Sequence, residues 1–150
     1  GTTMYLASGS FAAEPGMVTH VNEAIAKQYA AYGVSEAVRA GDFLYIGGIV
    51  AFADDGSVLA PNDGKVQLEV IYKRIKQLLK ANSATAKNVV SETLYVTDWS
   101  RFLDGAAARL NFYDEIGAAY PTAVAFEVRS LAAPGLVVEV QVVAYLGSKK

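Results

Sequence analysis

The last quarter of the chain holds two runs rich in β-branched and aromatic residues, from Tyr120 to Leu131 and from Leu136 to Ala144. Pro134-Gly135 separates them, and this pattern predicts two β-strands joined by a tight hairpin. Both alternating faces of the second run are mostly apolar. One face holds Leu136, Val138, Val140, Val142 and Ala144, and the other holds Val137, Glu139, Gln141, Val143 and Tyr145. A strand that is apolar on both faces must be covered on both.

Two stretches show helical periodicity instead. From Val66 to Ala81 the apolar residues form one stripe, with Asp63 as the predicted N-cap: Leu68, Ile71, Ile75, Leu78 and Leu79. A second helix is predicted from Ser100 to Ile116, with Asp98 or Ser100 as N-cap. Its apolar side is predicted to hold Phe102, Ala106, Leu110 and Tyr113. The basic residues of the first helix, which include Lys73 and Arg74, are predicted to face solvent.

Three further strands are predicted upstream of the C-terminal pair. Residues 34–39 and 42–46 flank Ala40-Gly41, which suits a two-residue hairpin loop, and residues 88–97 form the third strand. Gly47-Gly48 follows the second of these strands. Such a pair indicates a bulge or the close approach of another backbone or a ligand. A helix-capable stretch, residues 21–31, lies before all of them.

The predicted fold is therefore a single α+β domain, a β-sheet with two main helices on one face. A chain of 150 residues suffices for one such domain with a core. Two helices can cover only one face of the sheet. We therefore expect another copy of the chain to pack against the other face. On that face, Glu139 and Gln141 either make hydrogen bonds at a subunit contact or line a ligand site between subunits.

The composition limits the classes of function that this protein can have. Fifty-three per cent of the residues are hydrophobic and the mean hydropathy is +0.24, which again favours apolar surface buried between subunits. The net charge of −2 gives no electrostatic reason to bind nucleic acid. The sequence has no cysteine, no metal-ligand spacing and no run long enough to span a membrane, so we expect a cytoplasmic protein without metal or cofactor. His20, the only histidine, is expected at the surface.

The C-terminal segment resembles the signature of the RidA/YjgF family of small trimeric imine and enamine deaminases. That signature is Pro-Ala-Arg, a valine-rich strand, a Leu-Pro turn, and a Glu-hydrophobic-Glu strand that ends in Ala. Pro121, Glu139 and Ala144 fit it, whereas Ala123 replaces the arginine and Gln141 replaces the second glutamate. The resemblance covers residues 32–144. It implies a chorismate-mutase-like domain at residues 32–150, after an N-terminal extension at residues 1–31, and a homotrimer around a central barrel.

The resemblance also implies a cleft between neighbouring subunits. Carried over by position, its predicted catalytic residues are Gln141 and Ser100. The predicted ligand-binding residues are Tyr32, Gly48, Ile49, Ala123, Arg101 and Glu139. Ala123 cannot bind a carboxylate as an arginine would, and Gln141 cannot act as a base near neutral pH. A 2-imino carboxylate is therefore not the expected substrate.

The sequence leaves two functions open. In the first, a homotrimer binds a small metabolite and hydrolyses or tautomerises an imine, an enamine or a related carbonyl compound through backbone dipoles and a positioned water. In the second, the same trimer binds or senses a ligand without catalysis. The endoribonuclease activity also associated with the family is not favoured, because a single histidine provides no acid/base pair within one subunit.

Overall fold

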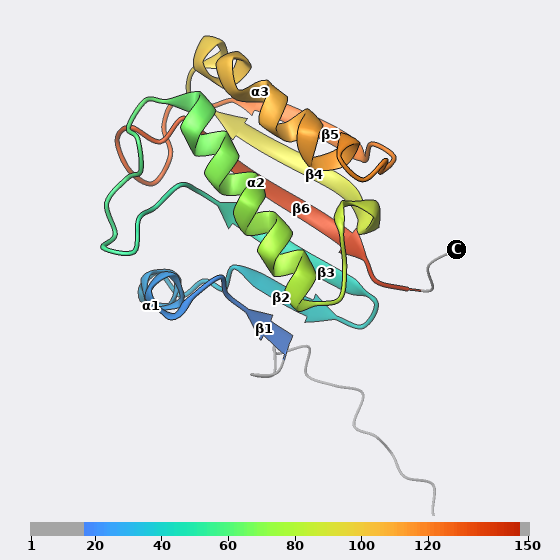
Figure 1. Ribbon diagram of the computed structural model, residues 1–150. Coiled ribbons are helices and arrows are strands. Elements are labelled where there is room, and N and C mark those ends of the chain that lie inside the picture. The colour runs from blue at the N-terminus through green and yellow to red at the C-terminus, as the bar shows by residue number, and fades with distance from the viewer. Residues whose placement is uncertain (1–16, 148–150) are drawn as a thin grey trace, which may run out of the picture.

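The computed structural model describes residues 17–147, which form one mixed sheet with helices on one side (Figure 1). In chain order the elements are β1 (Val18–Thr19), α1 (Glu23–Ala31), β2 (Ala37–Ala40), β3 (Phe43–Ile49), α2 (Gly64–Ala81), a 3-10 turn (Ala86–Asn88), β4 (Val89–Val96), α3 (Trp99–Asp114), β5 (Thr122–Glu127) and β6 (Val138–Tyr145). The strand order is β1-β2-β3-β6-β4-β5. The predicted α+β domain with two main helices on one face is confirmed.

The predicted C-terminal hairpin is wrong. β4 lies between β5 and β6, parallel to the first and antiparallel to the second. Residues 128–137 therefore pass over the end of β4 instead of turning back directly. Pro134-Gly135 belongs to this crossing, where the Gly135 carbonyl accepts from the Asn62 backbone and the Gln67 side chain, both at 2.8 Å. A turn signal locates a bend but does not show how many strands the bend crosses.

The helix starts and the first hairpin follow local side-chain chemistry. Asp63 caps α2 by accepting from the Val66 amide, as predicted, and Asp98 caps α3 by accepting from the Arg101 amide. The N-cap of α3 is thus Asp98 and not Ser100. In the first hairpin the loop is Gly41-Asp42, one residue later than predicted, since Ala40 pairs with Phe43.

The core lies between the two helices and the sheet. The predicted stripe of α2 is fully buried: Leu68, Ile71, Ile75, Leu78 and Leu79. The predicted stripe of α3 is partly wrong, because Leu110 is 45% exposed and the buried side holds Phe102, Gly105, Phe112 and Tyr113. Arg109 also lies on this inner side. Hydrophobic periodicity did not predict this buried side because two of its positions, Gly105 and Arg109, are not hydrophobic.

Gly105 lets α2 and α3 approach closely. A Cβ at this position would lie 2.5 Å from the backbone oxygen of Gly64 and 2.8 Å from Leu68 Cδ1. At an unhindered helical site, Gly→Ala stabilises by about 1 kcal/mol. Here we expect Gly105→Ala to destabilise the fold by about 1–3 kcal/mol, because the backbones must separate. Urea unfolding of both proteins measures this difference, and a gain in stability for the variant would refute the close contact.

The segment at residues 17–31 is tied to the rest of the domain, while residues 1–16 of the predicted extension lie outside the described residues. β1 pairs with β2, and the Gln28 amide in α1 donates to the Ala53 carbonyl at 2.8 Å. His20 is not a surface residue as expected. Its side chain is 19% exposed and lies 3.3 Å from a carboxylate oxygen of the buried Glu36.

Arg74 is likewise not a solvent-facing residue. Its guanidinium donates to the backbone oxygens of Val50 and Phe52, so it anchors the loop after β3 to α2. Lys73, its neighbour in sequence, is exposed as predicted. Across residues 17–147, none of the helices combines the length and the hydropathy that a membrane span requires.

Candidate functional site

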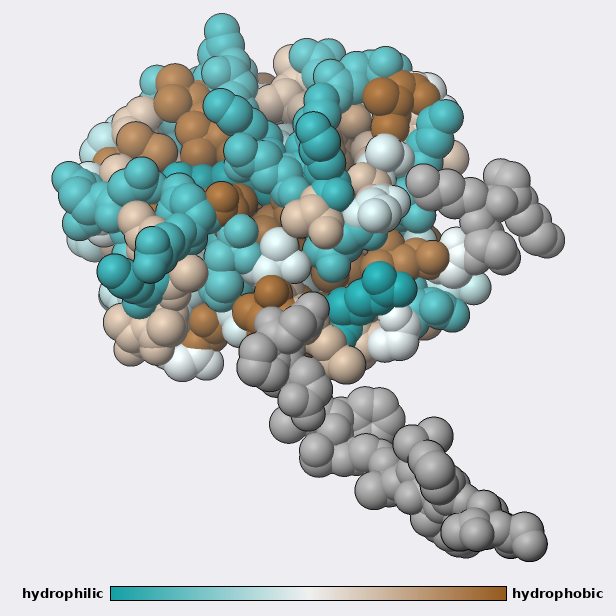
Figure 2. Space-filling model, turned by 60° about the horizontal axis from the view of Figure 1, so that its bottom comes forward, coloured by the Kyte–Doolittle hydropathy of each residue, from teal (hydrophilic) through white to brown (hydrophobic). Residues whose placement is uncertain are grey.

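The sheet face turned away from α2 and α3 carries large apolar side chains that remain exposed in a single chain. They are Phe43, Tyr45, Val124, Phe126 and Tyr145, and on β3 and β6 they alternate with buried core residues. We call this surface the open face. On the side of the molecule in Figure 2, by contrast, hydrophobic residues form separate patches among hydrophilic ones. An apolar sheet face of this kind is typical of an interaction surface.

A hollow of about 330 Å³ opens on this face where β3, β4 and β6 meet the loop after β5. We call it the Glu139 hollow. Its walls are Gly48, Tyr95, Val128, Ser130, Leu131, Glu139 and Gln141. Glu139 and Gln141 project to the same side because they are two residues apart on β6. Three of the residues predicted from the sequence, Gly48, Glu139 and Gln141, are therefore brought together.

Two glycines make room for these side chains. A Cβ at Gly48 would lie 1.8 Å from Glu139 Oε1, and a Cβ at Gly47 would lie 2.8 Å from the Cα of Gln141. Gly47 also has a φ of +142°, which side chains rarely allow. The sequence predicted a close contact at this glycine pair. The structure shows that the side chain of Glu139 and the backbone of β6 make it.

Glu139 is the charged group of the hollow. Within residues 17–147 it forms no salt bridge, and its carboxylate accepts no hydrogen bond. Burial raises the pKa of the Glu139 carboxyl, since an apolar environment disfavours the charged form. A ligand that supplies positive charge or a hydrogen-bond donor would relieve this cost.

Two tyrosines at this site were not predicted from the sequence. Tyr95 is the cross-strand partner of Glu139, and its ring stacks on Phe126 at a centroid distance of 6.1 Å. Tyr29 reaches from α1 to donate its hydroxyl to the Gly48 carbonyl at 3.0 Å. The strand alternation could have drawn attention to Tyr95. The contact of Tyr29 depends on how α1 packs, which no local pattern reveals.

The remaining predicted residues lie elsewhere in a single chain. Ile49 is fully buried in the core, so its side chain cannot contact a ligand on the open face. Tyr32 is 73% exposed at the end of α1. Ser100 and Arg101 lie in the first turn of α3, where the Ser100 hydroxyl donates to Asp98 at 2.7 Å and Arg101 pairs with the same residue.

Ala123 lies on the opposite face of the sheet from Gln141. It is the β4 neighbour of Glu92 across the β4–β5 pair, whereas Gln141 is paired with Thr93. Consecutive residues of β4 point to opposite faces, so the two partners do as well. A cleft that uses both positions must therefore be formed by two copies of the chain.

Beside Ala123 is a buried carboxylate with three aromatic or cationic neighbours. Glu92 is 1% exposed, bonds to the Arg109 guanidinium, and accepts from the Tyr72 hydroxyl at 2.6 Å. Burial, followed by the nearby Glu92, raises the pKa of Tyr72, so its hydroxyl keeps its proton and remains a donor. Arg109 also lies over the ring of Tyr113 at 5.5 Å. Glu92, Tyr72 and Arg109 satisfy one another, so we assign these three groups to stability, whereas the buried Tyr113 hydroxyl has no hydrogen-bond partner within residues 17–147.

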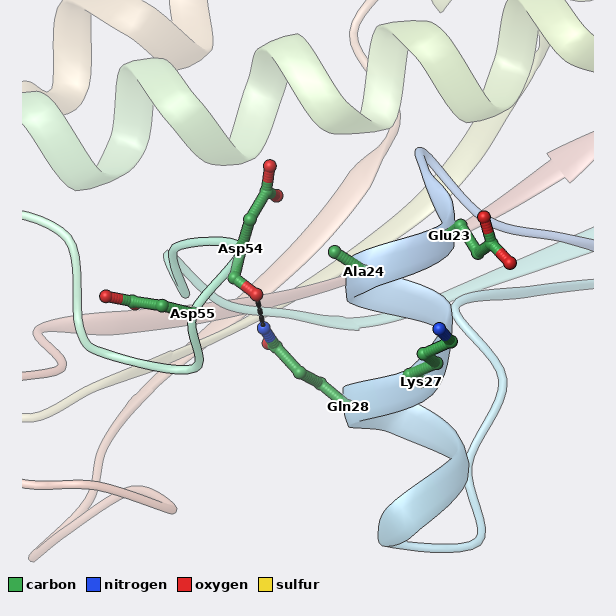
Figure 3. A pocket seen from close by; sticks show the side chains of 6 residues that line it. All are labelled: Glu23, Ala24, Lys27, Gln28, Asp54 and Asp55. Carbon is green, nitrogen blue, oxygen red and sulfur yellow. Dashed lines mark hydrogen bonds between the residues drawn. The ribbon is translucent and has the colours of Figure 1, made fainter.

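A second hollow lies between α1 and the turn after β3. Figure 3 shows its walls: Glu23, Ala24, Lys27, Gln28, Asp54 and Asp55, with the Gln28 amide bonded to the Asp54 carbonyl. Its charged groups are of both signs, and in this view Glu23, Asp54 and Asp55 point in different directions. The Gln28 Oε1 atom is buried without a hydrogen-bond partner within residues 17–147, and it is the one buried side-chain acceptor here that could receive a donor. Among residues 17–147, no group of three or more acidic or histidine side chains is placed to hold a metal ion.

The sheet order and helix placement define a chorismate-mutase-like α+β domain. A family model described as Endoribonuclease L-PSP matches residues 7–146, and the chain belongs to this family. The predicted resemblance to the RidA/YjgF family is confirmed by solved structures that this chain resembles. Rv2704 of Mycobacterium tuberculosis, a member of the YjgF/YER057c/UK114 family, is 30% identical, with 85% of this chain and 98% of that chain covered and a TM-score of 0.67.

Two further relatives agree. RidA from the Antarctic bacterium Psychrobacter sp. PAMC 21119 is 28% identical, with 74% of this chain and 86% of that chain covered and a TM-score of 0.64. The RutC family protein PH0854 of Pyrococcus horikoshii is 28% identical over 113 residues, which are 74% of this chain and 85% of that protein.

Proposed function

We propose that this protein is a cytoplasmic homotrimer that binds a small metabolite in clefts between copies and hydrolyses an imine or enamine there. The observation that carries the proposal is the convergence of Gly48, Glu139 and Gln141 in one hollow on an exposed apolar sheet face. Ala123 lies on the other face of the sheet. A shared cleft would therefore need the edge strand β5 of one copy to lie beside the open face of its neighbour.

The substrate in this proposal carries no carboxylate. In the family the arginine after Pro-Ala holds that group, and here the position is Ala123. A charge-assisted contact is worth about 1.5–3 kcal/mol, or roughly one to two powers of ten in binding. Arg129 lies after the end of β5 at Glu127 and is exposed, and it is not one of the residues that line the Glu139 hollow. Arg101, the other candidate, is paired with Asp98.

The chemistry requires only a positioned water. Its oxygen adds to the carbon of the C=N group, its protons pass to the nitrogen, and the C–N bond breaks to give a carbonyl compound and ammonia. Gln141 can orient this water by hydrogen bonds without taking its proton. Backbone dipoles beside Gly48 stabilise the developing charge, as backbone donors do in other sites of acyl and imine chemistry.

The second candidate function is a non-catalytic trimer that binds or senses the same class of ligand. The residue that favours it is Gln141, because a glutamine at this place removes a side-chain base. Tight binding of a metabolite with no turnover of any imine would support this alternative.

The test is the hydrolysis of freshly generated 2-iminopropionate by the wild type and by Ala123→Arg/Gln141→Glu, with the solution mass measured on the same samples. We expect a trimeric wild type with little activity and a double variant that gains at least tenfold, as the restored contact implies. A wild type that hydrolyses this substrate as fast as the double variant would show that another residue anchors the carboxylate.

A further inference from the structure

We infer that the Glu139 hollow binds an organic cation, with Glu139 as its counter-ion. This deepens the proposed function by naming the ligand's charge, and it rests on the placement of the site on the open face. The ligand class is a protonated imine, amidine or amine with a small apolar substituent. Such a ligand has the opposite charge to the carboxylates that the family's arginine holds.

The first support is the charge of the hollow itself. Its walls contain one ionisable acid, Glu139, together with the phenol of Tyr95, and no basic residue. Ala123 points to the other face of the sheet, and Gln141, which shares the open face with Glu139, carries no charge. An unpaired carboxylate that is partly withdrawn from water gains strongly from a cation.

The second support is the shape and polarity of the walls. Val128, Leu131 and the ring of Tyr95 surround the carboxylate, so the hollow offers apolar contact around a single charge. The absence of a Cβ at Gly48 leaves the space that the Glu139 carboxylate occupies. Aromatic and aliphatic walls around one carboxylate suit a planar organic cation better than a hydrated metal ion.

The groups that face Glu139 also define its pH response. Tyr95 faces it from β4, and Tyr29 of α1 lies close enough for its own pKa to be raised, first by burial and then by Glu36 and Glu139. The raised pKa keeps the Tyr29 phenol neutral. Binding of a cation should therefore weaken as the pH falls through the pKa of Glu139, because protonation removes the counter-ion.

Three probes of nearly equal shape test the inference: benzamidinium, benzamide and benzoate, which differ in charge. Binding to the full chain is measured by titration calorimetry or by NMR shifts. We expect benzamidinium to bind about tenfold more tightly than benzamide, as a charge-assisted contact implies, and benzoate to bind most weakly. Glu139→Gln should remove the preference for benzamidinium and leave benzamide binding within about twofold.

Glu127→Gln is the matched control, because Glu127 is an exposed carboxylate on β5 with the parity of the helix-covered face. It should retain the wild-type preference. The pH dependence of the wild type requires no variant and guards against a folding defect in Glu139→Gln. Equal binding of benzamide and benzamidinium, or a preference that survives Glu139→Gln, would overturn the inference. Since no turnover is measured, this result is independent of whether the protein hydrolyses imines.

Discussion

Arg109→Leu is expected to destabilise the domain by about 3–5 kcal/mol, the usual cost of leaving a buried charge without its partner. Glu92 has no exposed side-chain surface and would retain only the hydroxyl of Tyr72. For a domain of this size each kcal/mol lowers the Tm by roughly 2–4 °C, so the loss is of the order of 10 °C. Calorimetry or urea unfolding measures it.

Arg101→Leu is the matched control on the same helix. The Arg101–Asp98 pair has both side chains 43% exposed, and such surface pairs contribute about 0–1 kcal/mol. Adding Glu92→Gln to Arg109→Leu should recover part of the loss, because it removes the charge and keeps an oxygen for Tyr72. If Arg109→Leu were as mild as Arg101→Leu, Glu92 would not be a charged group that depends on Arg109.

Tyr45→Asp is expected to convert the proposed trimer to a monomer. Tyr45 lies on β3 of the open face between Val38 and Val143, and it is 48% exposed in the single chain. Assembly through this face would bury the new carboxylate in apolar surroundings without a partner, at a cost of several kcal/mol for each copy. Sedimentation velocity or light scattering measures the mass.

Gln77→Asp supplies the comparison, because Gln77 is exposed on α2 and faces away from the sheet. It introduces the same group and should leave the trimer intact. Tyr45→Phe should also assemble, since it keeps the apolar ring. A trimer that persists in Tyr45→Asp would place the interface somewhere other than the open face.

Local patterns predicted most of the elements, because each reports a short-range property. The stripe of α2, its Asp63 cap and the alternation of β6 were all readable from spacing. What spacing could not predict is the strand order. β5 and β6 are adjacent in the sequence, yet β4 separates them, and this depends on pairing energies across the whole sheet.

The candidate site was predictable to the extent that its residues share a strand or follow one. Glu139 and Gln141 share a face of β6, and Gly48 lies on β3, the strand that pairs with β6. Tyr29 was not predictable, because its contact with the Gly48 carbonyl spans 19 residues and requires α1 to pack at the end of β3. The same holds for Arg109, whose partner Glu92 is on another element.

The proposed substrate charge can be tested by the ratio of kcat/KM values for two imines in one preparation of the wild type. One is 2-iminopropionate, and the other is an imine of similar size without a carboxylate, generated in the same way. The lack of an arginine at Ala123 and the unpaired Glu139 predict a preference for the carboxylate-free imine, by about tenfold or more. A preference for 2-iminopropionate would contradict both the neutral or cationic substrate and the role assigned to Glu139.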